Sequence, residues 1–151
     1  MGPDSQGTQL ACLAPREASI FACLVDTVAA PEPLLPAVAR TDCAFAFDRW
    51  MAASPALNAR GMRALLLALE VTPLARGYRR RFRQLPVDDR VRFLEDIERS
   101  PNRQLRQLMK VMKAAAFLAY YGDDTVMRRV GYDAAANVQR GRELRAQEGR
   151  P

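Results

Sequence analysis

Hydrophobic residues recur at intervals of three and four along most of the chain, which is the spacing of one face of an α-helix. In the stretch 15–29, for example, these positions are Ile20, Phe21, Leu24, Val25 and Val28. No segment of useful length alternates apolar and polar residues with the period of a strand. The pattern therefore predicts an all-α protein, with a single compact domain of about six or seven helices.

Prolines, glycines and capping residues divide this pattern into separate helices. We expect helices over 15–29, from Thr41 or Asp42 to about 54, from Pro55 to Pro73, over 76–83, from Leu85-Pro86 through the core positions 91, 94 and 97, from Ser100 (as N-cap) to Gly122, and over 123–130. Phe47, Trp50 and Met51 share the core-facing side of the second helix. The block 65–69 is apolar nearly all round, which predicts that the third helix is central and packed on several sides.

The two ends of the chain differ in composition from the middle. Residues 1–13 contain Gly, Pro and Gln and are expected to form a flexible arm. Residues 134–151 are rich in charge and poor in apolar side chains, which predicts a frayed helix or a disordered tail. The helical domain is thus expected over 14–133.

Composition excludes several kinds of catalytic site. The 151 residues include no His, which removes Ser-His and Cys-His nucleophile pairs, the HExxH zinc helix and His-ligated haem. The three Cys have no metal-binding spacing, and no glycine-rich phosphate loop occurs. The acid pairs Asp88-Asp89 and Asp123-Asp124 point about 100° apart on a helix and stand where helix-starting acids belong. We expect no catalytic residue, no cofactor site and no metal site in this chain.

Arginine dominates the charge of the chain. Lys and Arg number 23 against 17 Asp and Glu, for a net charge of +6, and seven Arg stand between positions 60 and 83 against the single acid Glu70. Within this stretch Arg79, Arg80 and Arg81 accompany Tyr78 and Phe82, which have the spacing of core residues. The stretch Arg76 to Arg83 is therefore either a solvated helix face or a surface for nucleic acid, anionic lipid or an acidic protein.

Three tyrosines gather near the C-terminus, in Tyr120-Tyr121-Gly122-Asp123 and Gly131-Tyr132-Asp133. One interpretation is a helical corner, in which Gly122 turns the chain, Asp123 caps the next helix and the rings fill the gap. The other is an interface, because tyrosine offers a rigid contact surface with a polar tip.

The pattern Leu118-Ala119-Tyr120-Tyr121-Gly122-Asp123, followed by Gly131-Tyr132, resembles the signature of the gluconate 2-dehydrogenase subunit 3 family. Its members are small helical subunits of membrane-associated flavin dehydrogenases of the glucose-methanol-choline type. The segments 13–17, 26–28, 80–82, 85–86 and 90–94 resemble that family in the same order, so the resemblance spans roughly residues 13–133.

The resemblance implies a non-catalytic accessory subunit that binds and stabilises, or helps assemble, an FAD-dependent alcohol or sugar dehydrogenase. FAD is then expected on the partner and not on this chain, and a cytochrome or membrane surface would be reached through the partner. The expected partner-binding residues are Tyr120, Tyr121, Asp123, Tyr132, Arg79, Arg80 and Arg81. The alternative is a basic helical module that binds nucleic acid or anionic membrane through Arg76–Arg83; of the two, we expect the flavoprotein and not nucleic acid.

Hydropathy and the N-terminal residues bear on localisation. No apolar run approaches the roughly 20 residues of a membrane span, and the twin-arginine signal carried by many family members is absent. A cytoplasmic location is expected, with export to the periplasm or membrane alongside a partner as the alternative.

Overall fold

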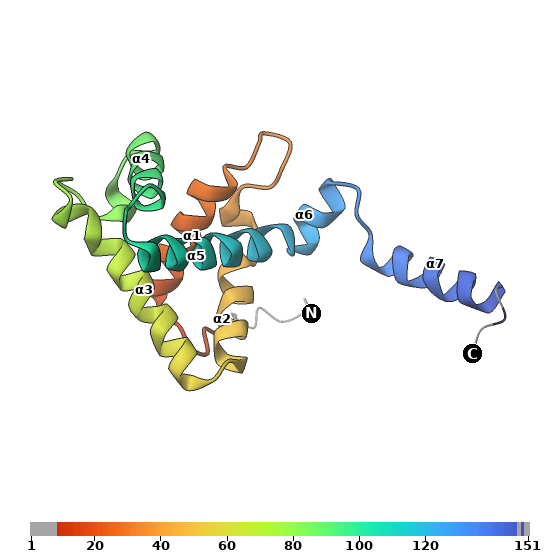
Figure 1. The fold of residues 1–151 in the computed structure, drawn as a ribbon. Coiled ribbons are helices and arrows are strands. Elements are labelled where there is room, and N and C mark those ends of the chain that lie inside the picture. The colour runs from red at the N-terminus through yellow and green to blue at the C-terminus, as the bar shows by residue number, and fades with distance from the viewer. Residues whose placement is uncertain (1–8, 148, 150–151) are drawn as a thin grey trace, which may run out of the picture.

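Seven α-helices and two 3₁₀ turns follow one another along the chain in the computed structural model, which describes residues 9–147 and residue 149 (Figure 1). These are α1 (Pro15–Ala29), η1 (Val38–Arg40), α2 (Cys43–Ala53), α3 (Ala56–Ala75), η2 (Phe82–Gln84), α4 (Val87–Glu98), α5 (Arg103–Tyr121), α6 (Asp124–Arg129) and α7 (Ala134–Gln147). No strand occurs among the described residues. The prediction of an all-α chain is confirmed.

The first helix occupies the centre of the fold. α1 packs against α2, α3, α4 and α5, and its Ile20, Phe21, Leu24 and Val25 are at most 1% exposed. Phe21 stacks on Phe47 of α2 with ring centroids 3.9 Å apart. The prediction of a central third helix is therefore wrong: α3 buries one face only.

The second helix buries a narrower face than its sequence predicts. Phe47 is buried and Met51 packs against the core, but Trp50 is 41% exposed. Successive residues on a helix point about 100° apart, so Phe47 and Met51 share a face that Trp50 only borders. Trp50 is not a core residue of this chain.

The segment just before α1 is fixed, contrary to the prediction of a flexible arm over 1–13. Leu13 is buried, Leu10 packs against the core, and the backbone N–H groups of residues 11, 12 and 13 all donate to Asp48 of α2. Residues 1–8 lie outside the described residues, so that part of the prediction is untested.

The arginine-rich segment after α3 is not the predicted helix over 76–83. α3 continues past Pro73 to Ala75, Gly77 then adopts a left-handed conformation at φ 89°, and an irregular loop leads to η2. Phe82 is nevertheless buried and its ring lies 6.0 Å from that of Phe93, while Tyr78 meets Phe93 edge-on at 5.9 Å. Both aromatic residues therefore reach the core from loop and turn backbone.

In α4 and α5 the helix ends follow the sequence closely, except for the cap of α5. Asp88 and Asp89 stand in the first turn of α4, and Gly122 ends α5 as expected. The side chain of Asn102, and not that of Ser100, caps α5 by accepting from the N–H groups of residues 104 and 105. Ser100 instead accepts a hydrogen bond from the N–H of Asn102.

The last helix projects away from the rest of the molecule (Figure 1). Residues 134–147, expected as a frayed helix or disordered tail, form α7, whose side chains described by the structure are almost all exposed. Within the described residues, no helix combines the length and apolar character needed to cross a bilayer.

Candidate partner-binding surface

Tyr120 belongs to the core of the corner between α5 and α6. Its side chain is fully buried, and its hydroxyl donates to the carbonyl oxygen of Pro36 at 2.7 Å. Burial raises the pKa of the Tyr120 hydroxyl. This residue therefore ties α5 to the loop between α1 and η1, and its ring is not available to a partner.

Asp123 joins three segments at the same corner. Its Oδ1 accepts from the N–H of Thr125 at 2.8 Å and of Val126 at 3.4 Å, which caps α6, and its Oδ2 accepts from the N–H of Asp42 at 2.8 Å. Partial burial opposes ionisation, but the hydrogen bonds from Asp42, Thr125 and Val126 outweigh it and lower the pKa of Asp123. The carboxylate holds the start of α2 against the corner.

Tyr121, the next residue along from Tyr120, faces outward. Together with other apolar side chains on the outer face of α5 it forms a surface that we call the α5 patch: Val111, Ala114, Phe117, Leu118 and Tyr121. Its four large side chains are between 38% and 65% exposed. The rings of Phe117 and Tyr121 are nearly parallel, with centroids 6.1 Å apart, so the patch contains a pair of neighbouring aromatic side chains.

Tyr132 lies beyond α6, at the base of the projecting helix. It is half exposed, follows Gly131 at φ 80°, and lines a surface hollow together with Val138, Arg142 and Arg145 of α7. The structure thus separates the three tyrosines: Tyr120 is buried, whereas Tyr121 and Tyr132 are exposed on α5 and beside α7.

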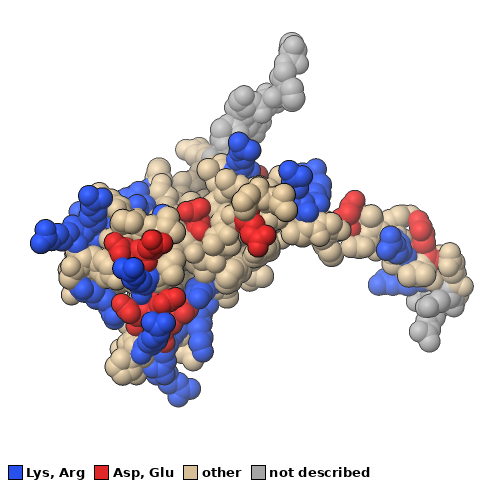
Figure 2. Space-filling model, turned by 90° about the horizontal axis from the view of Figure 1, so that it is seen from above, with Lys and Arg blue, Asp and Glu red and all other residues tan. Residues whose placement is uncertain are grey.

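The three arginines Arg79, Arg80 and Arg81 lie at the other end of the molecule. All three are exposed, and none takes part in the ion pairs found among the described residues. Figure 1 places the loop after α3 and helix α6 at opposite ends of the chain's fold, and Figure 2 shows basic side chains at the edge where α3 ends. The structure therefore does not bring the arginines and the tyrosines together in one site.

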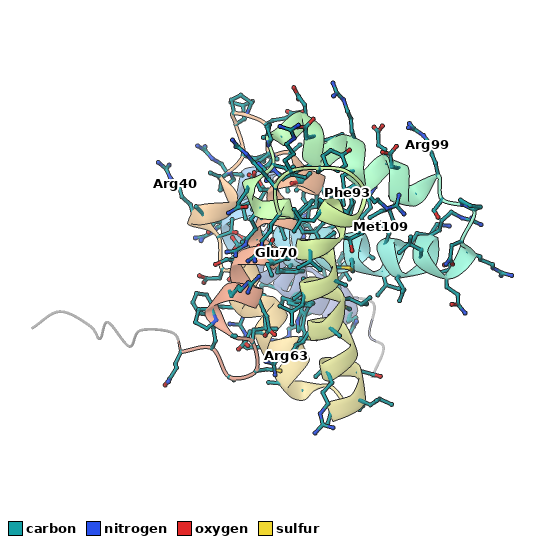
Figure 3. All side chains as sticks on the ribbon, turned by 90° about the vertical axis from the view of Figure 1, so that its left-hand side faces the viewer. Arg40, Arg63, Glu70, Phe93, Arg99 and Met109 are labelled. Carbon is teal, nitrogen blue, oxygen red and sulfur yellow. The ribbon has the colours of Figure 1, made fainter. Side chains whose placement is uncertain are left out.

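The structure buries three carboxylates that were not expected to be buried. Glu17 accepts from the N–H of Ala14 at 2.8 Å and from Nε of Arg63 at 2.9 Å, and Glu70 accepts from Nε of Arg83 at 3.0 Å. Figure 3 shows Arg63 and Glu70 leaving α3 on the same side. Glu70 carried a signal, as the one acid among seven arginines.

Asp48 is the third buried carboxylate, and it has no such signal in the sequence. It accepts three backbone N–H groups, from Ala11, Cys12 and Leu13, at 2.7 to 2.9 Å. Burial opposes the charge of Asp48, but these three bonds outweigh that effect and lower its pKa. The carboxylate of Asp48 therefore binds the segment before α1 to α2.

Arg90 and Cys23 make an unusual contact between α4 and α1. An Nη of Arg90 lies 2.9 Å from Sγ of Cys23 and 3.1 Å from the hydroxyl oxygen of Thr27, and a carboxylate oxygen of Asp26 lies 3.7 Å away. Burial raises the pKa of Cys23, and Arg90 only partly offsets that effect. Cys23 is therefore a thiol at neutral pH, and reactive cysteines are thiolates.

An apolar cavity of about 60 Å³ lies between α3 and α5, where Leu69, Leu105 and Met112 are among the lining residues. Ligand pockets measure roughly 300 to 1,000 Å³, so this space accommodates a side chain at most. No group of three or more His, Cys, Asp or Glu stands within reach of one metal ion in the described part of the chain.

Comparison of the chain with protein-family models, with curated proteins and with solved structures finds no match.

Proposed function

We propose that this chain is a non-catalytic accessory subunit that binds and stabilises, or helps assemble, an FAD-dependent alcohol or sugar dehydrogenase of the glucose-methanol-choline type. The class of partner comes from the resemblance at Tyr120–Asp123 and Gly131-Tyr132. Binding to a protein is supported independently by the surface of α5.

The observation that carries this proposal is the α5 patch. Contiguous exposed apolar surface on a soluble domain marks sites that bind protein or membrane, and aromatic residues are enriched where binding energy concentrates. The patch contains Tyr121 and lies directly beside the buried Tyr120 that the same motif provides. In this proposal Tyr120 and Asp123 hold the corner in shape, and Tyr121 with Phe117 and Leu118 contacts the catalytic subunit.

The test is affinity capture of the tagged full chain from lysate of its own cells, with flavin absorbance and sugar or alcohol dehydrogenase activity read in the bound fraction. We expect a stoichiometric flavoprotein with the wild-type chain. Leu118→Asp should reduce the bound flavin at least tenfold, because it places a charge in the centre of an apolar contact.

Leu34→Asp provides a control, since Leu34 is also an exposed leucine, at 79% against 65% for Leu118, and lies in the loop after α1. This variant should retain the flavoprotein. A bound fraction without flavin, or flavin retained by Leu118→Asp when its helical circular dichroism is normal, would overturn the proposal.

The second candidate function is binding of nucleic acid or anionic membrane through Arg76–Arg83. It is favoured by the exposure of Arg79, Arg80 and Arg81 on one loop. Binding of phosphates by these arginines should weaken by orders of magnitude between about 50 and 200 mM salt. Polarisation assays with labelled DNA and RNA, and flotation with anionic vesicles, measure this; no binding at low salt would remove the candidate.

A further inference from the structure

The surface hollow at the base of α7 combines an aromatic ring with two arginines. Its lining residues come from the link between α6 and α7 and from one face of α7, and we call it the α7 hollow: Tyr132, Asn137, Val138, Gly141, Arg142 and Arg145. It measures about 470 Å³. Ligand sites have volumes of roughly 300 to 1,000 Å³, with largely apolar walls and a few convergent polar groups. The α7 hollow has this size and this kind of lining.

Local hydrogen bonds fix Tyr132 relative to α7. Gly131 has φ 80°, and the N–H groups of Gly131 and Tyr132 donate to carbonyl oxygens in the last turn of α6 at 3.2 and 2.9 Å. This pair of bonds is the Schellman motif, which sets the direction in which the chain leaves a helix. Asp133 then begins α7, because its Oδ1 accepts from the N–H of Ala136 at 3.0 Å. The backbone on both sides of Tyr132 is therefore held, although α7 projects from the molecule (Figure 1).

The charged side chains that line the α7 hollow are both positive. Arg142 and Arg145 stand three residues apart, so they are neighbours on one face of the helix, and neither takes part in an ion pair among the described residues. The one acid of α7, Glu143, points about 100° away from Arg142, and its carboxylate accepts from the amide of Gln139 at 2.9 Å. Like charges at this spacing destabilise a helix, so an anion held by both arginines removes an unfavourable interaction.

From these observations we propose that the α7 hollow binds a nucleotide, with the phosphate held by Arg142 and Arg145 and the base against the ring of Tyr132. Guanidinium groups present paired donors that match phosphate oxygens, and any base stacks on a tyrosine ring. A carboxylate side chain of a protein satisfies the arginines but offers no ring to Tyr132. A free nucleotide and a single strand of nucleic acid present the same two groups.

The α7 hollow is separate from the other two candidate surfaces of this chain. The α5 patch lies on a different helix, so nucleotide binding does not depend on the flavoprotein. Figure 1 places the loop that carries Arg79, Arg80 and Arg81 at the end of the fold opposite to α7, so a nucleotide in the hollow is not in contact with that loop.

Isothermal titration calorimetry of the full chain with three compounds tests the proposal. AMP carries a base and a phosphate, ribose 5-phosphate lacks the base, and adenosine lacks the phosphate. We expect AMP to bind at least tenfold more tightly than either of the others, with an affinity that falls as salt rises. A labelled single-stranded oligonucleotide, followed by polarisation and displaced with AMP, distinguishes the sources: the tighter ligand of the two identifies a strand or a free nucleotide.

Substitutions locate the binding site on α7. The double variant Arg142→Gln/Arg145→Gln removes both charges and should weaken AMP at least tenfold, while glutamine preserves the helix because its helix propensity is close to that of arginine. Tyr132→Ala should reduce the affinity for AMP to that for ribose 5-phosphate, whereas Tyr132→Phe keeps the ring and should leave it unchanged. Arg140→Gln is the matched control, since Arg140 is exposed on the other side of α7, and it should also leave AMP binding unchanged.

Three outcomes would overturn the proposal. They are equal binding of AMP and ribose 5-phosphate, AMP binding that survives the double arginine variant, and no detectable binding of AMP or the oligonucleotide at low salt. A glutamate-rich peptide that binds more tightly than AMP, and that the double variant releases, would also overturn it by assigning the α7 hollow to a protein. Leu118→Asp should leave AMP binding unchanged and the double arginine variant should leave flavoprotein capture unchanged, so failure of this proposal and failure of the proposed function are distinguishable.

Discussion

Oδ1 of Asp48 accepts a hydrogen bond of 2.7 Å from the backbone N–H of Leu13, 35 residues earlier in the chain. The same carboxylate accepts the N–H groups of Ala11 and Cys12. One side chain of α2 thereby satisfies three consecutive backbone donors and fixes the position at which α1 begins. The attachment is backbone-directed, so it depends on Asp48 and not on which residues stand at 11 and 12.

Replacing Asp48 by Asn should destabilise the chain strongly. The amide presents one acceptor oxygen where the carboxylate presents two, and a buried N–H that loses its acceptor costs about 1–3 kcal/mol. We expect the free energy of unfolding in urea to fall by about 2 kcal/mol. Asp96→Asn, at an exposed position of α4, is the control and should change it by less than about 0.5 kcal/mol.

Asp48 and Asp123 should also make the free energy of unfolding depend on pH. Both have a pKa below the ordinary value of about 3.9, so the unfolded chain binds more protons than the folded chain in that range. Their contribution is present above pH 4 and is lost as the pH falls through the folded-state pKa values. Urea unfolding at a series of pH values should show that the free energy of unfolding falls steeply with pH for the wild type and less steeply for Asp48→Asn. Parallel curves would show that Asp48 does not cause this pH dependence.

The ion pair between Glu70 and Arg83 should contribute more than an ion pair on the surface. Glu70 is 1% exposed and accepts from both the backbone N–H and the Nε of Arg83. A double-mutant cycle with Glu70→Gln and Arg83→Gln should give a coupling of about 1.5–3 kcal/mol. The same cycle on the exposed pair Glu95–Arg99 should give less than about 0.5 kcal/mol; equal couplings would count against the anchoring role of Glu70.

Substitution by phenylalanine should have different effects on stability at the buried Tyr120 and at the exposed Tyr132. Tyr120→Phe removes the hydroxyl that donates to Pro36 and should lower the free energy of unfolding by about 1 kcal/mol. Tyr132→Phe alters a half-exposed side chain and should leave the free energy of unfolding unchanged. Thermal or urea unfolding of the two variants measures the difference. A destabilised Tyr132→Phe variant would contradict this prediction, because it would show that the Tyr132 hydroxyl contributes to the stability of the fold.

Removal of residues 134–151 should leave the folded core intact. α7 projects from the molecule and has few contacts with the other helices, so we expect a change in unfolding free energy below about 0.5 kcal/mol. Truncation after Gly122 is the contrasting variant, because it also removes the fully buried Val126 and the hydrogen bonds of Asp123. That shorter chain should lose about 2 kcal/mol or more.

Helical periodicity and capping chemistry carried most of the fold prediction. The apolar spacing of α1 and α5, the cap at Asp123 and the stop at Gly122 are local properties, and each is found as the sequence predicts. The sequence could not tell which helix is central, because α3 is apolar on two faces and periodicity does not say which faces are covered. The loop at 78–81 was missed for a related reason: Tyr78 and Phe82 have helical spacing but reach the core from irregular backbone.

Less of the candidate site could be predicted. The tyrosine motif located the α5–α6 corner, but the pattern alone did not separate the buried Tyr120 from the exposed Tyr121. Asp48 carries no sequence signal, since its three donors are backbone N–H groups that any residue except proline supplies. The partner-binding role of Tyr121, Tyr132 and Arg79–Arg81 stays a prediction.

The central position of α1 has a consequence for the order in which this protein is made. α1 is synthesised before the other described helices, and its most extensive interface is with α5, which follows only after three of them. At about 5–20 residues per second, the nascent chain carries the bare apolar face of α1 for several seconds before its counterpart exists. The apolar core of this protein therefore closes only after α5 has been synthesised.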